Sequence, residues 1–411
     1  MSATKCYLNA MGILCAAGDS AETVKAALLS QKACLTSTDE FSTGRPLPLG
    51  LYRGELPKIP LADRKWQSRN NRFALAVLAQ IEPEVSAAIA QYGADRVGVI
   101  IGTSTSGIAE GEPAIKQWAE TGEVSAGYDY AVQEMGATAQ FVATVLSVQG
   151  PTYGISTACS SGAKALASAR RLIQAGICDV VIAGGVDTLC HLTIKGFCSL
   201  EAVSDQQCNP FSANRNGINI GEGAALFLVS SEPQGVVLAG VGESSDAHHI
   251  SAPDPTGAGA VRCMSAALKD ANVVPEQVDY VNLHGTATGL NDQMEALAMN
   301  EVFGTETLCS STKPFIGHTL GAAGAVEAGI CWLMLNSDTE GNSTEGNSVD
   351  ESSKAPPLLP VHLWDGVTDS DLPAINLISP ESRIEKPVQY VLSNSYAFGG
   401  NNISLLLERL Q

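Results

Sequence analysis

The stretch TYGISTACSSGAKALASARRLI, residues 152–173, places one cysteine, Cys159, where a short β-rich segment changes to a helical pattern. The neighbours of Cys159 are Ala, Ser and Gly, which leave room for an acyl group to approach the sulfur. At a strand-to-helix turn, free backbone N–H groups and the helix dipole favour a thiolate. The pattern predicts a nucleophile of lowered pKa, although a lone cysteine in apolar surroundings is more often an inert core residue.

Strand and helix patterns alternate along the whole chain. Helical periodicity is present at 18–30, where Asp19 and Glu22 form an acidic capping pattern, and at 259–273. With 40 glycines and 5% aromatic residues among 411, the composition favours an α/β protein with small and aliphatic side chains in its interior. Short apolar segments predict buried strands at 6–13, 97–102, 180–184, 224–229, 236–242, 278–283, 307–311, 388–395 and 402–408.

A faint internal repeat divides the chain. The stretches STACSSGAKALASARRLIQAG and TLGAAGAVEAGICWLML each open a small-residue helix after a strand and a loop with a reactive side chain. We expect a duplicated α/β unit, with an N-terminal half at 1–235 that carries the cysteine and a C-terminal half at 236–411. Chance similarity between Ala- and Gly-rich helices is the alternative. The polar, acidic stretch 336–360 predicts a solvent-exposed, mobile insertion, and a plain solvated loop is favoured over a regulatory role.

The composition argues against several classes of protein. A formal net charge of −19 opposes binding to nucleic acid or to an anionic membrane surface. The start of the chain lacks the apolar core of a signal peptide, and we find no apolar run long enough to span a bilayer. The 11 cysteines include no CxxC pair, which favours a reduced, cytoplasmic protein over a disulfide framework or a zinc site. We expect neither a metal nor another cofactor.

Two of the six histidines follow predicted strands in segments rich in Gly and Thr. His284 lies in VDYVNLHGTATGLNDQMEAL and His318 in SSTKPFIGHTLGAAGAVEA. In an open α/β fold the functional crevice lies beyond the carboxyl ends of the strands, where both histidines and Cys159 would fall. A single histidine is more often structural. A cysteine with two histidines at strand ends makes a nucleophile with two imidazole partners the better hypothesis.

Four motifs together, TACSSG, HGTAT…ND…E, KPFIGHTLGAAGAVE and NSYAFGGNN, closely resemble the elongating β-ketoacyl-acyl carrier protein synthases of the thiolase superfamily. The resemblance covers essentially the whole chain outside the acidic stretch. It implies a thiolase-like fold, in which duplicated βαβαβαββ halves form α-β-α-β-α layers. It also implies a decarboxylative condensation of a cysteine-bound acyl group with malonyl-acyl carrier protein, in fatty acid or in polyketide or polyene biosynthesis.

The resemblance also implies roles for individual catalytic residues. Cys159 would carry the acyl group as a thioester, and His284 and His318 would stabilise the enolate formed when carbon dioxide leaves. Backbone N–H groups of Cys159 and Phe398 would form an oxyanion hole. Lys313 and Glu327 would interact and organise the histidine site, and a purely structural ion pair is the alternative.

Substrate-binding positions follow from the same resemblance. Thr286 and Thr288 would hold the phosphopantetheine arm or the malonyl group. Phe398 resembles a gating phenylalanine whose loop moves on Gly399 and its neighbour. Ala397 stands where the family more often has Gly, which puts the mobility of the gate in doubt. We also expect 103–108 on the floor of the acyl pocket.

The expected partner is an acyl carrier protein, which is acidic like this chain and therefore needs a local basic site. Arg64, Lys65 and Arg69 resemble the positions at which related synthases meet their carrier, and a solvated basic face without a partner is the alternative. A homodimer and a heterodimer with a related ketosynthase-like subunit, such as an inactive chain-length factor, both remain open. A thiolase is disfavoured because His318 stands where a second cysteine would be, and a serine hydrolase because CSSG does not match GxSxG.

Overall fold

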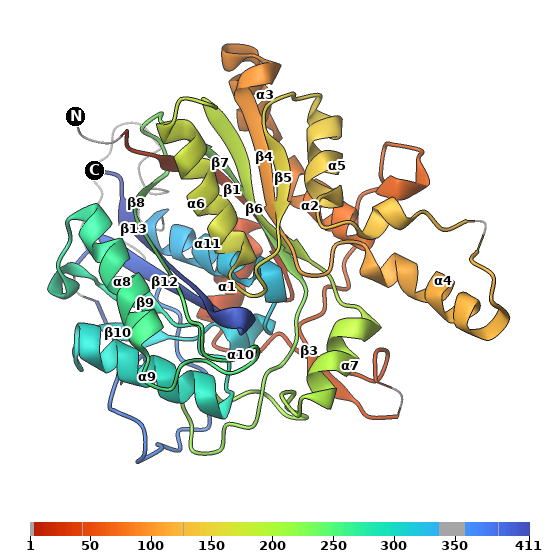
Figure 1. Ribbon diagram of the computed structural model, residues 1–411. Coiled ribbons are helices and arrows are strands. Elements are labelled where there is room, and N and C mark those ends of the chain that lie inside the picture. The colour runs from red at the N-terminus through yellow and green to blue at the C-terminus, as the bar shows by residue number, and fades with distance from the viewer. Residues whose placement is uncertain (1–3, 43, 126, 337–357, 385) are drawn as a thin grey trace.

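The computed structural model describes residues 4–42, 44–125, 127–336, 358–384 and 386–411 (Figure 1). Within them, an eleven-stranded sheet has the order β11-β10-β9-β12-β13-β8-β1-β7-β6-β4-β5, and a small hairpin pairs β2 with β3. The strands are β1 (Tyr7–Cys15), β2 (Thr36–Thr38), β3 (Leu47–Leu49), β4 (Val97–Gly102), β5 (Thr152–Ile155), β6 (Val180–Asp187), β7 (Gly223–Ser230), β8 (Val236–Ser245), β9 (Tyr280–Asn282), β10 (Leu308–Ser310), β11 (Asn376–Leu377), β12 (Tyr390–Ala397) and β13 (Asn401–Arg409).

One strand order occurs twice in this sheet. The first part runs β5-β4-β6-β7-β1 and the second runs β10-β9-β12-β13-β8. In the first part β4 is parallel to β5 and β6, whereas β7 is antiparallel to β6 and β1. The second part repeats this pattern, with β9 parallel to β10 and β12 and with β13 antiparallel to β12 and β8. The duplication inferred from the faint sequence repeat is therefore visible in the topology.

Helices form three layers around the two parts of the sheet (Figure 1). In the middle, α6 packs on β4 and β6, α11 packs on β7, β1 and β12, and the two helices contact each other. α2 and α5 cover the outer face of the first part, and α8 with α9 covers that of the second. The predicted α-β-α-β-α class is confirmed. The helices are α1 (Ala21–Leu29), α2 (Arg69–Ala79), α3 (Glu82–Tyr92), α4 (Ile108–Thr121), α5 (Ala137–Leu146), α6 (Ser161–Gln174), α7 (His191–Ser199), α8 (Ala258–Ala271), α9 (Gly289–Phe303), α10 (Lys313–Ile316) and α11 (Ala323–Asn336).

Small residues let the two middle helices approach closely. A Cβ atom added to Gly162 on α6 would lie 2.8 Å from the Cβ of Ala325 on α11. One added to Gly324 would lie 2.8 Å from the Cβ of Ala163. α11 is buried on nearly all its faces, as a helix enclosed between two sheets must be. Small side chains at these four positions therefore set the distance between the two middle helices.

Short elements depart from the sequence prediction. All nine predicted strands are present, and the four-residue β5 is the short β-rich segment that precedes Cys159, whereas β2, β3 and β11 have two or three residues each and were not predicted. α1 begins with Ser20 as its N-cap, whose hydroxyl accepts from the Thr23 N–H, so Asp19 and Glu22 do not form the cap. Nearly all of the acidic stretch 336–360 lies outside the described residues.

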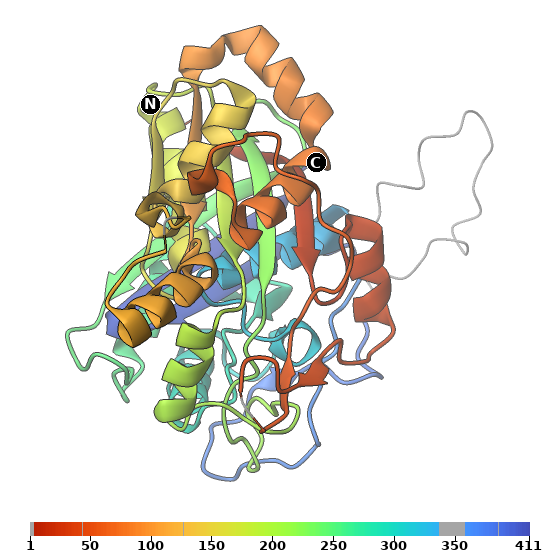
Figure 2. The same cartoon turned by 90° about the vertical axis from the view of Figure 1, so that its right-hand side faces the viewer.

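α4 projects from the body of the molecule and lies above α7 when viewed from that side (Figure 2). Ile115 and Trp118 of α4 are both more than half exposed. Among the described residues no single helix has the length and apolarity to cross a membrane, and one strongly bent pair, α2 with α3, meets that test by length and composition alone.

Candidate active site

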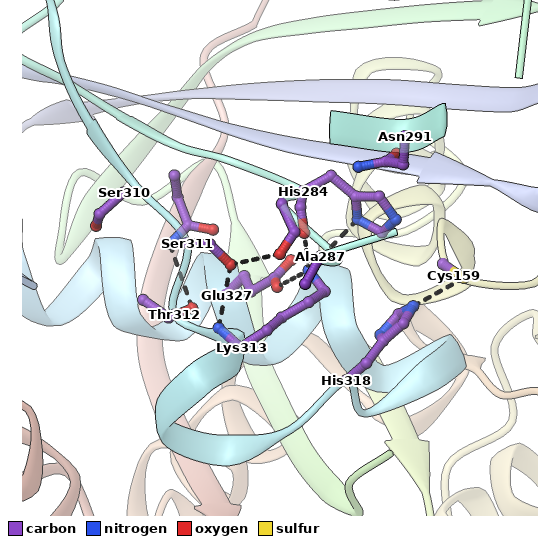
Figure 3. Close-up of polar contacts among 12 residues, drawn as sticks. Cys159, His284, Ala287, Asn291, Ser310, Ser311, Thr312, Lys313, His318 and Glu327 are labelled. Atoms are coloured by element: carbon purple, nitrogen blue, oxygen red, sulfur yellow. Dashed lines mark hydrogen bonds and ion pairs between the residues drawn. The ribbon is translucent and has the colours of Figure 1, made fainter. Parts of the chain in front are cut away.

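Three segments that follow strands bring Cys159, His284 and His318 to one cavity of about 660 Å³. Cys159 follows β5, His284 follows β9 and His318 follows β10 and α10. The Sγ of Cys159 lies 3.1 Å from Nε2 of His318, and the two imidazole ring centroids are 5.4 Å apart (Figure 3). The structure therefore brings together the predicted nucleophile and both imidazoles, from the two halves of the chain.

The turn that carries Cys159 is held by its own neighbours. Ala158 adopts φ 51°, a left-handed conformation that turns the chain sharply before the cysteine. The Ser161 hydroxyl accepts the N–H of Thr157 at 2.9 Å and donates to the carbonyl of Ala158 at 2.6 Å. α6 then begins at Ser161, so the turn and the first helical residue form one locally bonded unit.

The sulfur of Cys159 is buried, and this overturns one expectation. Burial raises the pKa of the Cys159 thiol to about 11, although Lys313 and the backbone N–H groups of Cys159 and Phe398 act in the opposite direction. The predicted lowering of its pKa is wrong for the unacylated protein because desolvation outweighs the nearby donors. The same two N–H groups are directed at the sulfur, and their proposed role as an oxyanion hole stays a prediction.

Both histidines are uncharged at neutral pH. Burial, with the positive charge of Lys313, lowers the pKa of His284 and of His318 well below the usual value of 6.5. The Nζ of Lys313 lies 3.4 Å from Nδ1 of His284. Because an ammonium only donates, Nδ1 accepts and Nε2 of His284 carries the proton. A neutral imidazole with an N–H directed away from Lys313 can donate to a substrate oxygen.

Lys313 and Glu327 form a buried ion pair beneath the histidines. Their Nζ and Oε1 atoms are 2.5 Å apart, and both side chains are 2% exposed. Lys313 also donates to the backbone carbonyl of His284, which links the pair directly to the segment that carries this histidine (Figure 3). Burial raises the pKa of the Glu327 carboxyl and Lys313 opposes that rise.

Two further buried carboxylates shape the loop that carries His284. Glu295 accepts the N–H groups of His284 and Gly285, each at 2.7 Å. Asp292 accepts the N–H groups of Phe211 and Ala287 at 2.8 and 3.2 Å. Neither residue was predicted to have a role. The signal was present in ND…E of the quoted motif, since acidic residues in an apolar helix must find buried donors.

Of the predicted substrate-binding residues, Thr286, Thr288 and Phe398 border the cavity, whereas Gly399 does not. The hydroxyls of Thr286 and Thr288 lie 3.0 Å apart, and both residues border the cavity. Phe398 is 39% exposed, and its ring centroid is 5.7 Å from that of Phe197. Gly399 adopts φ 77° and donates its N–H to the carbonyl of Ile250. The Phe398 loop is therefore tied to the segment after β8.

The predicted docking face has fewer available charges than expected. Arg64 is exposed, and the Nζ of Lys65 lies 4.7 Å above the Trp66 ring. Arg69, in contrast, directs its guanidinium inward to the buried carboxylate of Glu222, at 2.5 Å for the shorter contact. An inward ion pair leaves Arg69 little free charge to offer a partner.

The segment 103–108 does not border the described cavity, contrary to expectation. Thr103 and Thr105 instead donate their hydroxyls to the buried carboxylate of Asp187. Asp187 also accepts the N–H of Gly321, three residues after His318. The segment thus supports the histidine turn from behind and does not form the pocket floor.

The fold, with a thiol and two imidazoles at one cavity, is that of an acyl-transferring enzyme. The chain belongs to the β-ketoacyl synthase family: residues 9–234 match its N-terminal domain model and residues 236–343 its C-terminal domain model. It is 31% identical to the 3-oxoacyl-[acyl-carrier-protein] synthase 2 of Staphylococcus aureus strain COL, over 87% of each chain. The chain is therefore an acyltransferase of the ketosynthase type.

Solved structures of related proteins share the fold. A ketosynthase from Xenorhabdus doucetiae, solved in complex with its chain length factor, is 43% identical, has a TM-score of 0.89 and aligns over 99% of this chain and 98% of its own. A β-ketoacyl synthase from Burkholderia phymatum is 26% identical with a TM-score of 0.83, over 99% of this chain and 100% of its own.

Proposed function

We propose that the protein condenses an acyl group held on Cys159 with malonyl-acyl carrier protein, releasing carbon dioxide and a 3-oxoacyl-acyl carrier protein. The observation that carries this proposal is the contact of a buried thiol with one neutral imidazole while a second imidazole faces the same cavity. A carbon–carbon bond can form there without water competing for the intermediate.

The first step is the transfer of an acyl group to Cys159. His318, 3.1 Å from the sulfur, takes the thiol proton as the sulfur attacks the acyl thioester carbonyl. The N–H groups of Cys159 and Phe398 stabilise the oxyanion, and the departing carrier thiolate receives the proton. Because the pKa of the free thiol is about 11, general-base assistance is needed at neutral pH.

The second step is decarboxylation and condensation. Neutral His284, and His318 once its proton has moved from Nδ1 to Nε2, donate hydrogen bonds to the malonyl thioester oxygen, whose charge grows as the bond to carbon dioxide breaks. The resulting enolate attacks the acyl carbonyl on Cys159, and the cysteine sulfur leaves as a thiolate that takes up a proton from solvent. Lys313 and Glu327 hold His284 in its neutral, correctly oriented form.

We propose that the partner is a second ketosynthase-like chain. We favour a chain-length factor over a second copy of this chain. The 43% identical ketosynthase was solved with its chain length factor, which supports this choice. β5 lies at an edge of the sheet, where half-buried residues present unpaired backbone groups. The exposed Trp118 on α4 adds apolar surface. Replacing Trp118 with Glu should weaken that assembly, as measured by light scattering on the purified complex.

We propose that the acyl carrier protein docks near Arg64 and Lys65, whose positive charge complements an acidic partner. Arg69 contributes less because of its ion pair with Glu222. Whether the products enter fatty acid or polyketide and polyene synthesis depends on the carrier that docks, and both carriers belong in the assay.

The test is direct acylation of the purified protein. Incubation with a panel of acyl-carrier thioesters should add one acyl mass, as measured by intact-protein mass spectrometry, and malonyl-carrier protein should then give the 3-oxoacyl product. Cys159→Ala should remove the adduct, whereas Cys34→Ala, a half-buried cysteine outside the site, should keep it. An adduct that survives Cys159→Ala would refute the proposed nucleophile.

A further inference from the structure

The backbone of His318 is held by a segment from the other half of the chain. The N–H of His318 donates to the carbonyl of Asn219 at 2.6 Å, and the N–H of Gly221 donates to the carbonyl of His318 at 2.9 Å. Ile220 and His318 thus form a parallel bridge. The position of this imidazole depends on where residues 219–221 lie.

The segment 219–221 is fixed in turn by Gly50 and Glu222. Gly50 donates its N–H to Ile220 at 2.9 Å and accepts the N–H of Glu222 at 2.8 Å. A Cβ atom on Gly50 would lie 1.8 Å from the carbonyl oxygen of Ile316, two residues before His318. The backbone segments at Gly50, at 219–221 and at 316–318 therefore lie in direct contact, and a small displacement of one displaces the others.

The side chain of Glu222 connects this junction to α2. The Glu222 residue is fully buried, and its two carboxylate oxygens contact Nε and Nη2 of Arg69 at 2.9 and 2.5 Å. The same carboxylate accepts the N–H of Tyr52 at 3.0 Å and that of Leu189 at 3.3 Å. Arg69 Nη2 also donates to the carbonyl of Tyr52. One charge pair, with a fully buried carboxylate and a partly buried guanidinium, thus joins four segments around the support of His318.

We propose that Glu222 and Arg69 are positioning residues for His318, which hold its imidazole at the distance from Cys159 that both half-reactions require. A bidentate Arg–carboxylate pair has a fixed planar geometry, which suits it to this task better than a Lys pair. A misplacement of about 1 Å near reacting atoms can cost on the order of 10²-fold in rate. This inference rests on the proposed condensing function.

The experiment separates positioning from carrier docking by using a substrate without a carrier protein. The malonyl thioester of N-acetylcysteamine cannot contact a docking surface, so its decarboxylation reports on the histidines alone. We expect Glu222→Gln and Arg69→Gln each to lower kcat for this substrate by about 10-fold or more, with KM nearly unchanged and with a similar fall in the alkylation rate of Cys159. Arg69→Lys should retain an intermediate rate, and the double variant should be no slower than Glu222→Gln.

The ion pair of Arg96 and Asp179 supplies the matched control. Nε of Arg96 lies 2.8 Å from Oδ2 of Asp179, and neither residue borders the active-site cavity. Arg96→Gln should therefore leave kcat unchanged, even if it lowers the stability of the protein. If kcat of Arg69→Gln and of Glu222→Gln with the small thioester equals that of Arg96→Gln, the inference is overturned. If Arg69→Gln then raises KM for the carrier-protein substrate alone, Arg69 belongs to the docking surface. If His318→Ala also decarboxylates normally, the proposed function itself fails. Should Glu222→Gln not fold, Arg69→Lys and Arg69→Gln decide the matter.

Discussion

The turn after β5 and the turn after β10 occupy equivalent places in the two copies of one strand order, yet they are held in different ways. The β5 turn carries Cys159 and is bonded mainly to itself through the hydroxyl of Ser161. The longer β10 turn carries His318 and is bonded to distant residues, among them Asp187 and Asn219. Local bonding therefore places the proposed nucleophile, whereas the first half of the protein places the imidazole for which we propose a part in both steps.

The largest expected effect separates the chemical tasks of the two turns. His318→Ala should lower malonyl decarboxylation by roughly 10³-fold, because donors to the developing enolate are lost. Cys159→Ala should abolish condensation while leaving decarboxylation measurable, since the enolate can be protonated instead of attacking an acyl group. Carbon dioxide release and product formation, measured in parallel, test both. Equal loss of decarboxylation in the two variants would contradict this division.

The next effect concerns the buried ion pair that only the β10 turn possesses. Lys313→Met leaves the Glu327 carboxyl buried without its partner and should cost about 3–5 kcal/mol in the free energy of unfolding. Lys313→Met combined with Glu327→Leu should be less destabilising than Lys313→Met alone, because no buried charge remains. Urea unfolding of both variants measures the difference. A double variant with a lower free energy of unfolding than the single variant would show that the pair itself stabilises the fold.

A smaller effect should appear as a pH dependence in the loop that carries His284. Burial raises the pKa of Glu295 to about 7 from 4.5, so the folded state binds more protons than the unfolded state between these values. Its contribution to stability is present below pH 4.5 and is lost as the pH rises through 7. The stability of the wild type relative to Glu295→Gln should therefore fall by up to roughly 3 kcal/mol between pH 5 and pH 8.

Unfolding by urea at both pH values measures this difference, and Glu301→Gln, an exposed position on the same helix α9, is the control. No change in the relative stability of Glu295→Gln over this range would show that the N–H groups of His284 and Gly285 keep the carboxyl ionised throughout.

The smallest effect belongs to the locally bonded turn. Ser161→Ala removes one hydroxyl that both accepts from Thr157 and donates to Ala158, and should cost about 1 kcal/mol. Cys159 should still be acylated, because the positive φ of Ala158 and the start of α6 survive the change. Chemical unfolding and the acylation assay report the two quantities. A loss of more than about 3 kcal/mol in the free energy of unfolding would show that this turn, like the β10 turn, depends on contacts with distant residues.

The sequence predicted the parts of the site that local pattern controls. The strand ends that carry Cys159, His284 and His318 followed from apolar runs and small residues, and the motifs supplied Lys313 and Glu327. The pKa of Cys159 could not be predicted, because it depends on burial by both halves. The inward orientation of Arg69 was missed for the same reason: its partner Glu222 lies 153 positions away. Short edge strands such as β11 have too few residues to show the apolar pattern by which a strand is recognised in a sequence.

The packing of α6 against α11 has an evolutionary consequence. Each helix presents a glycine to an alanine of the other, Gly162 to Ala325 and Gly324 to Ala163, at separations that admit no extra methyl group. Neither ancestral copy could enlarge these positions alone after duplication. The two middle helices must therefore change in concert.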